Sequence, residues 1–311
     1  MKLASYQHEG RDSYGVVYDG RLVDIPTTWA DGPATLLEAL QNAENALHRI
    51  ANIAMSAEHT IQLDDVQLLA PIPNPPKLLG LAVNYVEHHR EFDRGHDLPD
   101  NPKYHTTPRP FLMPNTAVAH PNAEIPWPSY SRDVDYEVEL AVIIGKPTRC
   151  VSPEQARDCI AGYTIANDIS ARTVTHSEQR TERPKDKFFD WLHGKWSDGF
   201  CPMGPWMVTA DEFGDPAASH LKCWVNDDLR QDADSDLMIF DVYELVSFCS
   251  EIMTLTPGDV IATGTPSGVG FPTGRTLSGG DRVTCEIEGI GTLVNTMGTP
   301  PESFYRPCVP S

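Results

Sequence analysis

The sequence predicts a mainly β fold with some α-helix, in which a small N-terminal α+β domain precedes a larger sandwich or rolled sheet. Apolar runs of strand length recur through most of the 311 residues, whereas helical periodicity is confined to a few segments. The predicted strands do not alternate regularly with helices, which argues against a doubly wound parallel sheet. A chain of this length can bury a large core.

The first 70 residues are interpreted as a small separate domain. Two short strand-like runs flank Asp19-Gly20, which is a two-residue hairpin turn signal. Apolar residues then recur at helical spacing through residues 35–54, which predicts an amphipathic packing helix. Residues 71–77 contain four prolines, which fix the backbone angle φ and disfavour helix. This stiff segment is predicted to be the linker into the main domain.

The main domain, at residues 78–297, is predicted to consist mostly of strands and to end in a C-terminal tail at residues 298–311. Predicted strands fall at residues 77–83, 136–144, 162–169, 221–225, 259–263, 281–287 and 292–295, and helices at 85–93, 152–158 and 241–253. Two irregular segments, residues 94–131 and 177–199, interrupt this domain. Long irregular segments in a compact domain are usually lids or binding loops, so we expect function near them.

The composition argues against several kinds of partner. A formal net charge of -20 without any basic block disfavours nucleic acid and anionic membrane surfaces. No stretch approaches the ~18 apolar residues of a membrane span, and the start of the chain has no signal-peptide core, so we predict a cytoplasmic protein. The seven cysteines form no Cys-x-x-Cys pair and are predicted to be reduced thiols. An anionic ligand would need a local positive site, such as a metal ion with a few Arg or Lys side chains.

An alternating acidic run stands out at residues 133–145. In a strand, Asp133, Asp135, Glu137 and Glu139 share one face, and the other face is apolar. Glu137 and Glu139 project the same way with anchor points roughly 6.5 to 7 Å apart, so their charges repel. Two interpretations remain open. Either the acidic end faces a cleft and binds a hard divalent ion such as Mg²⁺ or Mn²⁺, or it is an exposed strand end with a solvated face.

Asp168 is a third acidic candidate, because an apolar strand ends there in Asn-Asp and Arg172 follows four residues later. One interpretation is the N-cap of a helix, where Asp is a preferred residue. The other is a third metal ligand beside Glu137 and Glu139. Three carboxylates would fill half of an octahedron and leave positions for water and a chelating substrate. Such an open site would be catalytic.

His88 and Glu91 are three residues apart, so on a helix they share a face and can form a hydrogen bond. A carboxylate that orients an imidazole makes a water-activating base. The alternative is a surface helix on which His88 is merely solvated. The pair follows a buried-looking strand and precedes the longest irregular segment, where a mobile lid would begin.

Two more segments are candidates for ligand contacts. Lys195 lies among glycines and aromatic residues, where it suits a carboxylate or an enolate; the alternative is an ordinary loop lysine. Residues 262–270 form a glycine-rich turn whose backbone N–H groups and hydroxyls suit an anion. The alternative there is a tight connection between strands. The turn is not a P-loop, because the Gly-Lys-Ser/Thr ending is absent.

These segments, in this order, resemble the fumarylacetoacetate hydrolase family over about residues 77–297. The resemblance rests on Asn84-Tyr85 with His88 and Glu91, on residues 135–140, on residues 167–172, on Gly194-Lys195 leading to Gly204-Pro205-Trp206, and on residues 263–270. It implies a mixed β-sandwich roll, usually a homodimer, with a small N-terminal domain in many members.

The resemblance also implies roles for individual residues. It implies Mg²⁺ or Mn²⁺ on Glu137, Glu139 and Asp168, catalysis by His88, Glu91 and Lys195 with the His88/Glu91 dyad on a closing lid, and substrate binding by Arg172, Thr265, Tyr85 and Gly264. The chain departs from the usual pattern at Met113, where many members have lysine, and at residues 173–176, where many have an Asp-x-x-Gln-like run. A charged, insertion-like stretch lies at residues 178–190. These departures alter the substrate pocket and leave the metal set intact.

Our leading hypothesis is a divalent-metal-dependent hydrolase that cleaves a C–C bond in a 2,4-dioxo acid of the acylpyruvate type through a metal-bound enolate. Alternatives are a decarboxylase of a 2-oxo dicarboxylate, an enol–keto isomerase of a 2-hydroxydienoate, and a non-catalytic, metal-dependent oxo-acid-binding protein. In each case the partner is a small anionic 2-oxo acid. An iron site built from His88, His89 and Glu91 is disfavoured, because adjacent helix residues point about 100° apart.

Overall fold

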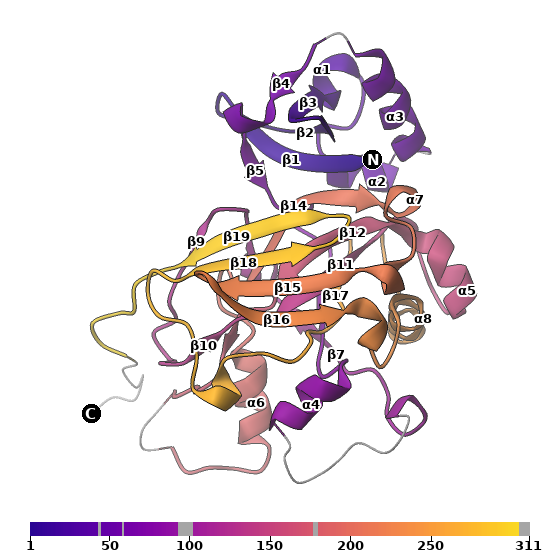
Figure 1. Ribbon diagram of the computed structural model, residues 1–311. Coiled ribbons are helices and arrows are strands. Elements are labelled where there is room, and N and C mark those ends of the chain that lie inside the picture. Colours follow the sequence, from indigo (N-terminus) through magenta and orange to yellow (C-terminus); the bar gives the residue numbers. More distant parts are fainter. Residues whose placement is uncertain (43–44, 58, 93–101, 177–179, 305–311) are drawn as a thin grey trace.

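A computed structural model of the chain describes residues 1–42, 45–57, 59–92, 102–176 and 180–304. The fold is mainly β with some helix, as predicted, and consists of two large sheets and a two-stranded ribbon (Figure 1). Parts of the predicted lid, of the charged stretch and of the C-terminal tail lie outside the described residues, namely 93–101, 177–179 and 305–311.

The larger sheet has twelve strands. Ten follow one another across it: β4 (Ile61–Gln62), β3 (Arg21–Asp24), β2 (Arg11–Tyr18), β1 (Lys2–His8), β14 (Cys201–Thr209), β12 (Ile160–Asn167), β11 (Val138–Ile144), β17 (Val260–Ala262), β6 (Leu78–Leu81) and β7 (Pro110–Met113). Two more, β5 (Gln67–Leu69) and β8 (Val118–Ala119), pair with β1 and β14. Because β1 pairs with β14, the sheet continues from the N-terminal residues into the rest of the chain. The domain division at residues 71–77 stays a prediction.

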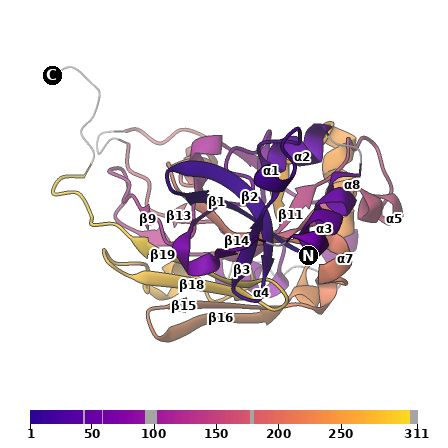
Figure 2. The ribbon, with the colours of Figure 1, turned by 90° about the horizontal axis from the view of Figure 1, so that it is seen from above.

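The second sheet has five strands in the order β16 (Asp228–Asp234), β15 (His220–Val225), β18 (Arg282–Ile287), β19 (Gly291–Met297) and β9 (Glu124–Ile125). The ribbon pairs β10 (Val134–Asp135) with β13 (Ser170–Ala171). Buried residues of β11 and β12 share one hydrophobic core with those of β15 and β18, so the two sheets form a sandwich. Seen from above, the N-terminal strands β1, β2 and β3 of the larger sheet lie in front of the rest of the molecule, and β15, β16 and β18 lie along one side (Figure 2).

The helices are mostly short. The α-helices are α1 (Ile25–Thr28), α2 (Leu36–Asn42), α3 (Ala46–Ser56), α4 (Val86–Phe92), α5 (Pro153–Ala156), α6 (Asp186–His193), α7 (Ala210–Phe213) and α8 (Val242–Ile252). The 3₁₀ helices are Leu63–Asp65, Pro102–Tyr104, Asn115–Ala117, Arg157–Cys159, Pro216–Ala218, Ser235–Leu237 and Phe271–Thr273. Helices α4 and α6 lie at the same end of the sandwich (Figure 1). Within the described ranges, none of these helices combines the length and apolar composition needed to cross a bilayer.

The structure corrects three of the predicted elements. The single helix predicted over residues 35–54 is wrong, because Asn45 takes a left-handed φ of 57° between α2 and α3. The strand predicted from residue 136 begins two residues later, at Val138, where the chain leaves the ribbon for the larger sheet. Part of the segment predicted to be irregular, residues 177–199, forms α6.

Candidate active site and metal centre

Strands β11 and β12 bring three carboxylates together. Val138 pairs with Asn167 and Glu139 with Ala166 across these strands, so Glu137 and Glu139 lie at the end of the ladder where Asp168 follows β12. The Glu137 N–H donates to the Asn167 side chain at 2.9 Å, and the Asp168 N–H donates to the Glu137 carbonyl at 2.9 Å. One oxygen from each of the three carboxylates lies within 4.8 Å of the other two. All three residues are at most 4% exposed, so the acidic face is buried and the solvated-strand interpretation is wrong. No helix begins at Asp168.

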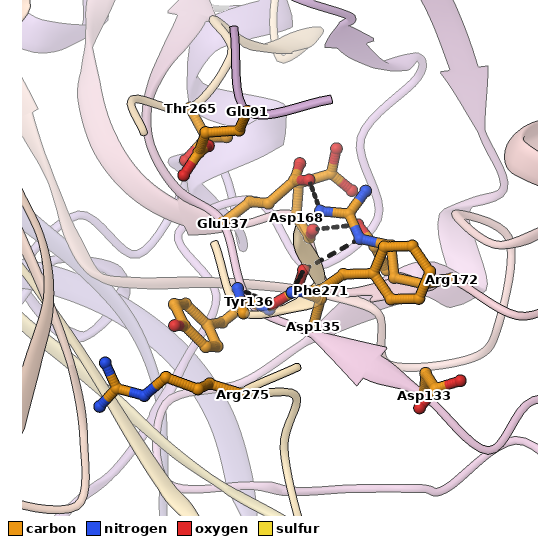
Figure 3. A network of polar contacts seen from close by, with 12 residues as sticks. Glu91, Asp133, Asp135, Tyr136, Glu137, Asp168, Arg172, Thr265, Phe271 and Arg275 are labelled. Atoms are coloured by element: carbon orange, nitrogen blue, oxygen red, sulfur yellow. Dashed lines mark hydrogen bonds and ion pairs between the residues drawn. The ribbon is translucent and has the colours of Figure 1, made fainter. Parts of the chain in front are cut away.

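Two cations contact this cluster. The ammonium of Lys195 lies 2.7 Å from Glu137 Oε2 and 2.7 Å from Asp168 Oδ2, and the residue is only 3% exposed. The Arg172 guanidinium donates to Glu137 Oε1 at 2.5 Å (Figure 3). Burial alone would raise the pKa of Glu137, but the positive charges of Lys195 and Arg172 outweigh burial and lower it. Lys195 is therefore a buried ion-pair partner and not an ordinary loop lysine.

The cluster keeps an excess of negative charge. Burial and the charges of Asp168 and Glu137 raise the pKa of Glu139 well above its ordinary value. Burial also raises the pKa of Asp168 to about 6, although Lys195 opposes this shift. Each of these shifts means that the local field disfavours a further negative charge. A cation placed among the carboxylates would remove this cost.

A hard divalent cation fits this cluster. Asp135 is also fully buried and accepts from Arg172 Nε at 3.0 Å. When all four carboxylates are ionised, their negative charge exceeds the positive charge of Lys195 and Arg172 by two. The Asp168 Oδ1 atom is buried and has no hydrogen-bond partner among the described residues. Carboxylate oxygens are the ligands that Mg²⁺ and Mn²⁺ prefer. Glu137, Glu139 and Asp168 are thus the residues that would hold the ion.

The glycine-rich turn after β17 orients the carboxylates. Three of its N–H groups donate to acidic side chains: Gly264 to Glu139 at 2.8 Å, Gly268 to Glu91 at 2.7 Å and Gly270 to Asp135 at 2.7 Å. The turn does bind anions, as the sequence suggested, but these anions are carboxylates of the same chain. Position 264 requires glycine, because its φ is +94° and a Cβ there would approach the Asn84 Cβ to 2.7 Å.

Helix α4 carries the predicted dyad. His88 Nδ1 lies 3.0 Å from Glu91 Oε2, and Glu91 Oε1 accepts from the Gly268 N–H. Glu91 therefore connects α4 to the glycine-rich turn and fixes the orientation of the imidazole. His88 is 6% exposed, so it is not the solvated surface histidine of the alternative interpretation.

A cavity of about 330 Å³ joins the carboxylate cluster to the dyad. Its polar lining is His88, His89, Arg109, Glu137, Asp168, Arg172, Lys195 and Thr265, and its apolar lining is Leu81, Ala82, Val83, Phe92, Phe111 and Trp191. Its volume lies near the lower limit of the roughly 300–1,000 Å³ range that is usual for ligand pockets. It suits a small ligand with an anionic end and an apolar middle.

The predicted substrate contacts divide into two groups. Arg172 and Thr265 line the cavity, and the Thr265 hydroxyl is fixed by donating to the Val138 carbonyl at 2.9 Å. Tyr85 and Gly264 are absent from the lining: Tyr85 is 2% exposed, and Gly264 acts on Glu139. Their assignment as substrate contacts gains no support from this cavity.

Sequence reasoning missed several residues of the site. Asp135 belongs to the alternating acidic run, so its position was visible, but its role as the partner of Arg172 was not. Arg109, Phe111 and Trp191 come from segments predicted to be irregular, and no local pattern marks them as cavity residues. Gln231 on β16 donates to Thr265 Oγ1 at 2.8 Å, a contact between distant segments that leaves no sequence signal.

Comparisons with known proteins identify the family. The sequence pattern described as fumarylacetoacetate (FAA) hydrolase C-terminal matches residues 77–298. The chain belongs to the fumarylacetoacetate hydrolase family. A Xenopus laevis protein named as a mitochondrial oxaloacetate tautomerase is 36% identical over 301 residues, which cover 95% of this chain and 89% of that protein.

Solved structures of the fumarylacetoacetate hydrolase family share the fold over nearly the whole chain. A 2-hydroxyhepta-2,4-diene-1,7-dioate isomerase from Mycobacterium marinum has 33% identity and a TM-score of 0.72, covering 96% of this chain and 98% of that chain. A maleylpyruvate hydrolase from Sphingobium sp. SYK-6, in complex with manganese(II) and pyruvate, has 31% identity and a TM-score of 0.76, covering 97% and 100%. Relatives in this family are thus enzymes named as tautomerases, isomerases and hydrolases.

The raised pKa of Glu139 predicts how the metal-free protein responds to pH. The folded state holds this proton where the unfolded chain has already lost it, so the free energy of unfolding falls as pH rises above the ordinary value of 4.5. The lowered pKa of Glu137 acts in the opposite sense, but only below that value. We expect the melting temperature of chelator-treated protein to fall from weakly acidic to weakly alkaline pH, and to fall less in Glu139→Gln. Calorimetric scans across pH measure this, and parallel curves for the two proteins would contradict it.

Proposed function

We propose that the chain is a divalent-metal-dependent hydrolase that cleaves the C3–C4 bond of a small anionic 2,4-dioxo acid. The observation that carries this proposal is the position of the His88–Glu91 dyad on the same cavity as three buried carboxylates and Lys195. Hydrolysis needs a general base that takes a proton from water. It also needs a cation that binds the 2-oxo acid, and an acidic cluster would hold that cation.

The dyad would activate the water. Because Glu91 faces His88 Nδ1, the other nitrogen, Nε2, is the one available to take a proton from water. The hydroxide adds to the C4 carbonyl, and the negative charge of Glu91 stabilises the imidazolium. When the C3–C4 bond breaks, its electron pair stays on C3 as the enolate of a 2-oxo acid, and His88 returns its proton to C3. The second product is the carboxylic acid that contains C4.

The other polar residues would hold the charged end of the substrate. Arg172 and Lys195 place positive charge beside Glu137 on the inner wall, near the carboxylate and 2-oxo group. Phe111 and Trp191, whose rings pack at 5.1 Å, form an apolar wall that excludes water from the middle of the ligand. When bound, Mg²⁺ or Mn²⁺ would act as a Lewis acid that polarises the 2-oxo group.

Enol–keto tautomerisation of a 2-oxo dicarboxylate is a second candidate. The specific observation in its favour is the 36% identity, over 95% of the chain, to the protein named as an oxaloacetate tautomerase. Tautomerisation moves a proton between C3 and the 2-oxygen and breaks no C–C bond. His88 alone would suffice for that transfer, and no water would be consumed.

Product analysis in ¹⁸O-labelled water tests the proposal. We expect Mg²⁺- or Mn²⁺-loaded protein to convert an acylpyruvate into pyruvate and a second acid that carries one ¹⁸O atom in its carboxyl group. Loss of the enol absorbance of oxaloacetate without fragmentation would favour tautomerisation, and CO₂ release would favour decarboxylation. Metal-dependent binding without any product in a screen of oxo acids would favour a binding protein. Any of these three results, without formation of the ¹⁸O-labelled second acid, contradicts hydrolysis.

The position of Arg109 in the cavity lining predicts that the protein prefers substrates with a second carboxylate. It lines the cavity, and its carbonyl accepts from the Ala82 N–H at 3.1 Å, which fixes the backbone at that point. A guanidinium–carboxylate contact contributes about 1.5–3 kcal/mol, so Arg109→Gln should raise KM for a dioxo dicarboxylate roughly 10- to 100-fold with little change in kcat. Steady-state kinetics with a matched monocarboxylate, which should show no such change, measures this. Arg132→Gln, at an exposed arginine outside the cavity lining, is the control.

A homodimer is part of the same proposal, because the family resemblance implies one. Light scattering of the purified chain across a range of concentrations tests it. A constant monomer mass would contradict it.

A further inference from the structure

A second group of metal-ligand side chains lies outside the reaction just described. His176, Asp190 and His193 each offer a ligand atom, and these atoms lie within 4.8 Å of one another. Two imidazole nitrogens and one carboxylate oxygen form a softer set than the three carboxylates of the candidate active site. We propose that His176, Asp190 and His193 bind a divalent transition-metal ion of the Zn²⁺ class, with water as the fourth ligand.

Aromatic packing holds both imidazole rings in place. The His176 ring lies 5.4 Å from the Tyr130 ring on one side and 5.4 Å from the His193 ring on the other. The Tyr130 hydroxyl also donates to the backbone carbonyl of His193 at 3.2 Å. The two rings are therefore positioned by contacts that do not depend on an ion. Such preorganisation lowers the entropy that binding must overcome.

The carboxylate of Asp190 is held in the same way. The Arg180 guanidinium donates to both of its oxygens, at 2.8 and 2.5 Å. Each carboxylate oxygen has two lone pairs, so this ion pair leaves one lone pair on each oxygen for a metal ion. Metal-binding carboxylates are commonly oriented by a hydrogen-bonded partner, which is the role that Arg180 takes here.

The position of the site connects it to the cavity wall. His193 ends α6, and Lys195 follows two residues later, whereas His176 comes four residues after Arg172. An ion on both histidines would join the two segments that carry Arg172 and Lys195 into the cavity. It would also fix Trp191, which lies on α6 and lines the cavity. The inferred ion would thus stabilise the wall of the substrate pocket, and it is separate from the ion that takes part in the reaction.

Zinc binding to the full-length, chelator-treated chain tests the proposal. All variants are made in the Glu139→Gln protein, because this change prevents the three carboxylates from binding zinc tightly. The zinc measured per chain is then zinc bound at the histidine site. We expect Glu139→Gln to retain one tight Zn²⁺ in equilibrium dialysis, and a further His193→Asn or His176→Asn change to weaken it by at least about 100-fold. His48→Asn, at an exposed histidine on α3, should leave binding unchanged. Equal affinity with and without His193 would overturn the proposal.

X-ray absorption at the zinc edge gives a second measurement that does not depend on a histidine variant. Zinc bound to Glu139→Gln should show imidazole scattering with nitrogen neighbours at about 2.0–2.1 Å. Zinc should also raise the melting temperature of this variant, but not that of the variant that lacks His193 as well. A first shell of oxygen alone, or no zinc retained by Glu139→Gln, would overturn the proposal whatever the stability of the histidine variants.

Discussion

Replacing Glu139 by glutamine is expected to abolish metal-dependent turnover, with kcat/KM falling about 10³-fold or more. Glu139 is 1% exposed and supplies one of the three carboxylates that would hold the cation. An amide oxygen is a much weaker ligand for a hard divalent ion than a carboxylate. The variant should also lose most of its affinity for Mn²⁺, which calorimetric titration measures alongside the steady-state kinetics.

Glutamine is chosen because it should preserve the fold. Its side-chain oxygen can still accept the hydrogen bond that the Gly264 N–H donates to Glu139 at 2.8 Å. It also removes a charge that burial and the neighbouring carboxylates disfavour. Loss of activity without loss of stability would therefore identify a functional carboxylate and not a structural one.

The matched control is Asp133→Asn. Asp133 begins the same acidic run, but its side chain accepts from the Thr173 hydroxyl and lies apart from the side-chain network around Arg172 (Figure 3). Its backbone carbonyl, which the substitution keeps, accepts from the Arg172 N–H at 2.9 Å. We expect this change to leave turnover and Mn²⁺ affinity close to those of the unchanged protein. Near-normal activity in Glu139→Gln, or full activity after chelation, would contradict the metal-dependent mechanism.

Much of the carboxylate cluster could be predicted from the sequence, because the positions of Glu137 and Glu139 follow from the local geometry of one strand. The alternation of a strand places Glu137 and Glu139 on one side, and the apolar run that follows them requires burial. Asp168 follows another apolar strand, and the fumarylacetoacetate hydrolase resemblance grouped it with Glu137 and Glu139. The structure adds the register, in which Val138 lies opposite Asn167.

Strand β14 shows where local reasoning failed. Residues 201–209 contain two prolines and a glycine, which are poor strand formers, so no strand was predicted there. The pairing of β12 with β14 shifts register between Tyr163 and Ile165, opposite the segment that contains Pro205. An irregular ladder of this kind accommodates residues that cannot donate to it. The stability of β14 comes from its central place in the sheet, which the sequence of the strand alone does not reveal.

For the acidic cluster, too, the sequence predicted which residues take part, whereas only the structure shows the contacts that hold them. The sequence identified the carboxylates, the dyad and Lys195, but it did not reveal how they are held. The glycine-rich turn donates to Glu139 and Asp135 of the acidic run and to Glu91 of α4, which are two separate segments of the chain. Contacts of this kind depend on the whole fold and leave no local pattern. For the same reason the cavity wall, including Arg109 and Trp191, became visible only in the structure.

Removing the His88 imidazole is expected to reduce hydrolysis by about 10²- to 10⁴-fold in kcat, the usual contribution of a general base. His88→Asn keeps a polar side chain on α4 but has no group that can accept a proton from water at neutral pH. Substrate and Mn²⁺ binding should change little, because the carboxylate cluster is intact. Single-turnover measurements of pyruvate release separate the chemical step from binding.

Glu91→Gln should also reduce hydrolysis strongly, although Glu91 itself does not line the cavity. Both carboxylate oxygens of Glu91 are used: Oε1 accepts from the Gly268 N–H at 2.7 Å, and Oε2 lies 3.0 Å from His88 Nδ1. Glutamine has only one acceptor oxygen. If that oxygen remains on Gly268, the amide group donates to Nδ1 and moves the imidazole proton to Nε2, where it blocks acceptance of a proton from water. Glu91 is thus a positioning residue.

The control for both variants is Glu87→Gln, which lies on the same helix. Glu87 is exposed and pairs with Arg90 on the surface, so its loss should leave kcat unchanged. A shift in the pH profile of Glu91→Gln, together with the loss in kcat, would distinguish a tautomer effect from local unfolding of α4. Full hydrolysis in His88→Asn would contradict water activation by the dyad. Tautomerisation that survives in His88→Asn would show that its proton transfer uses another residue of the cavity.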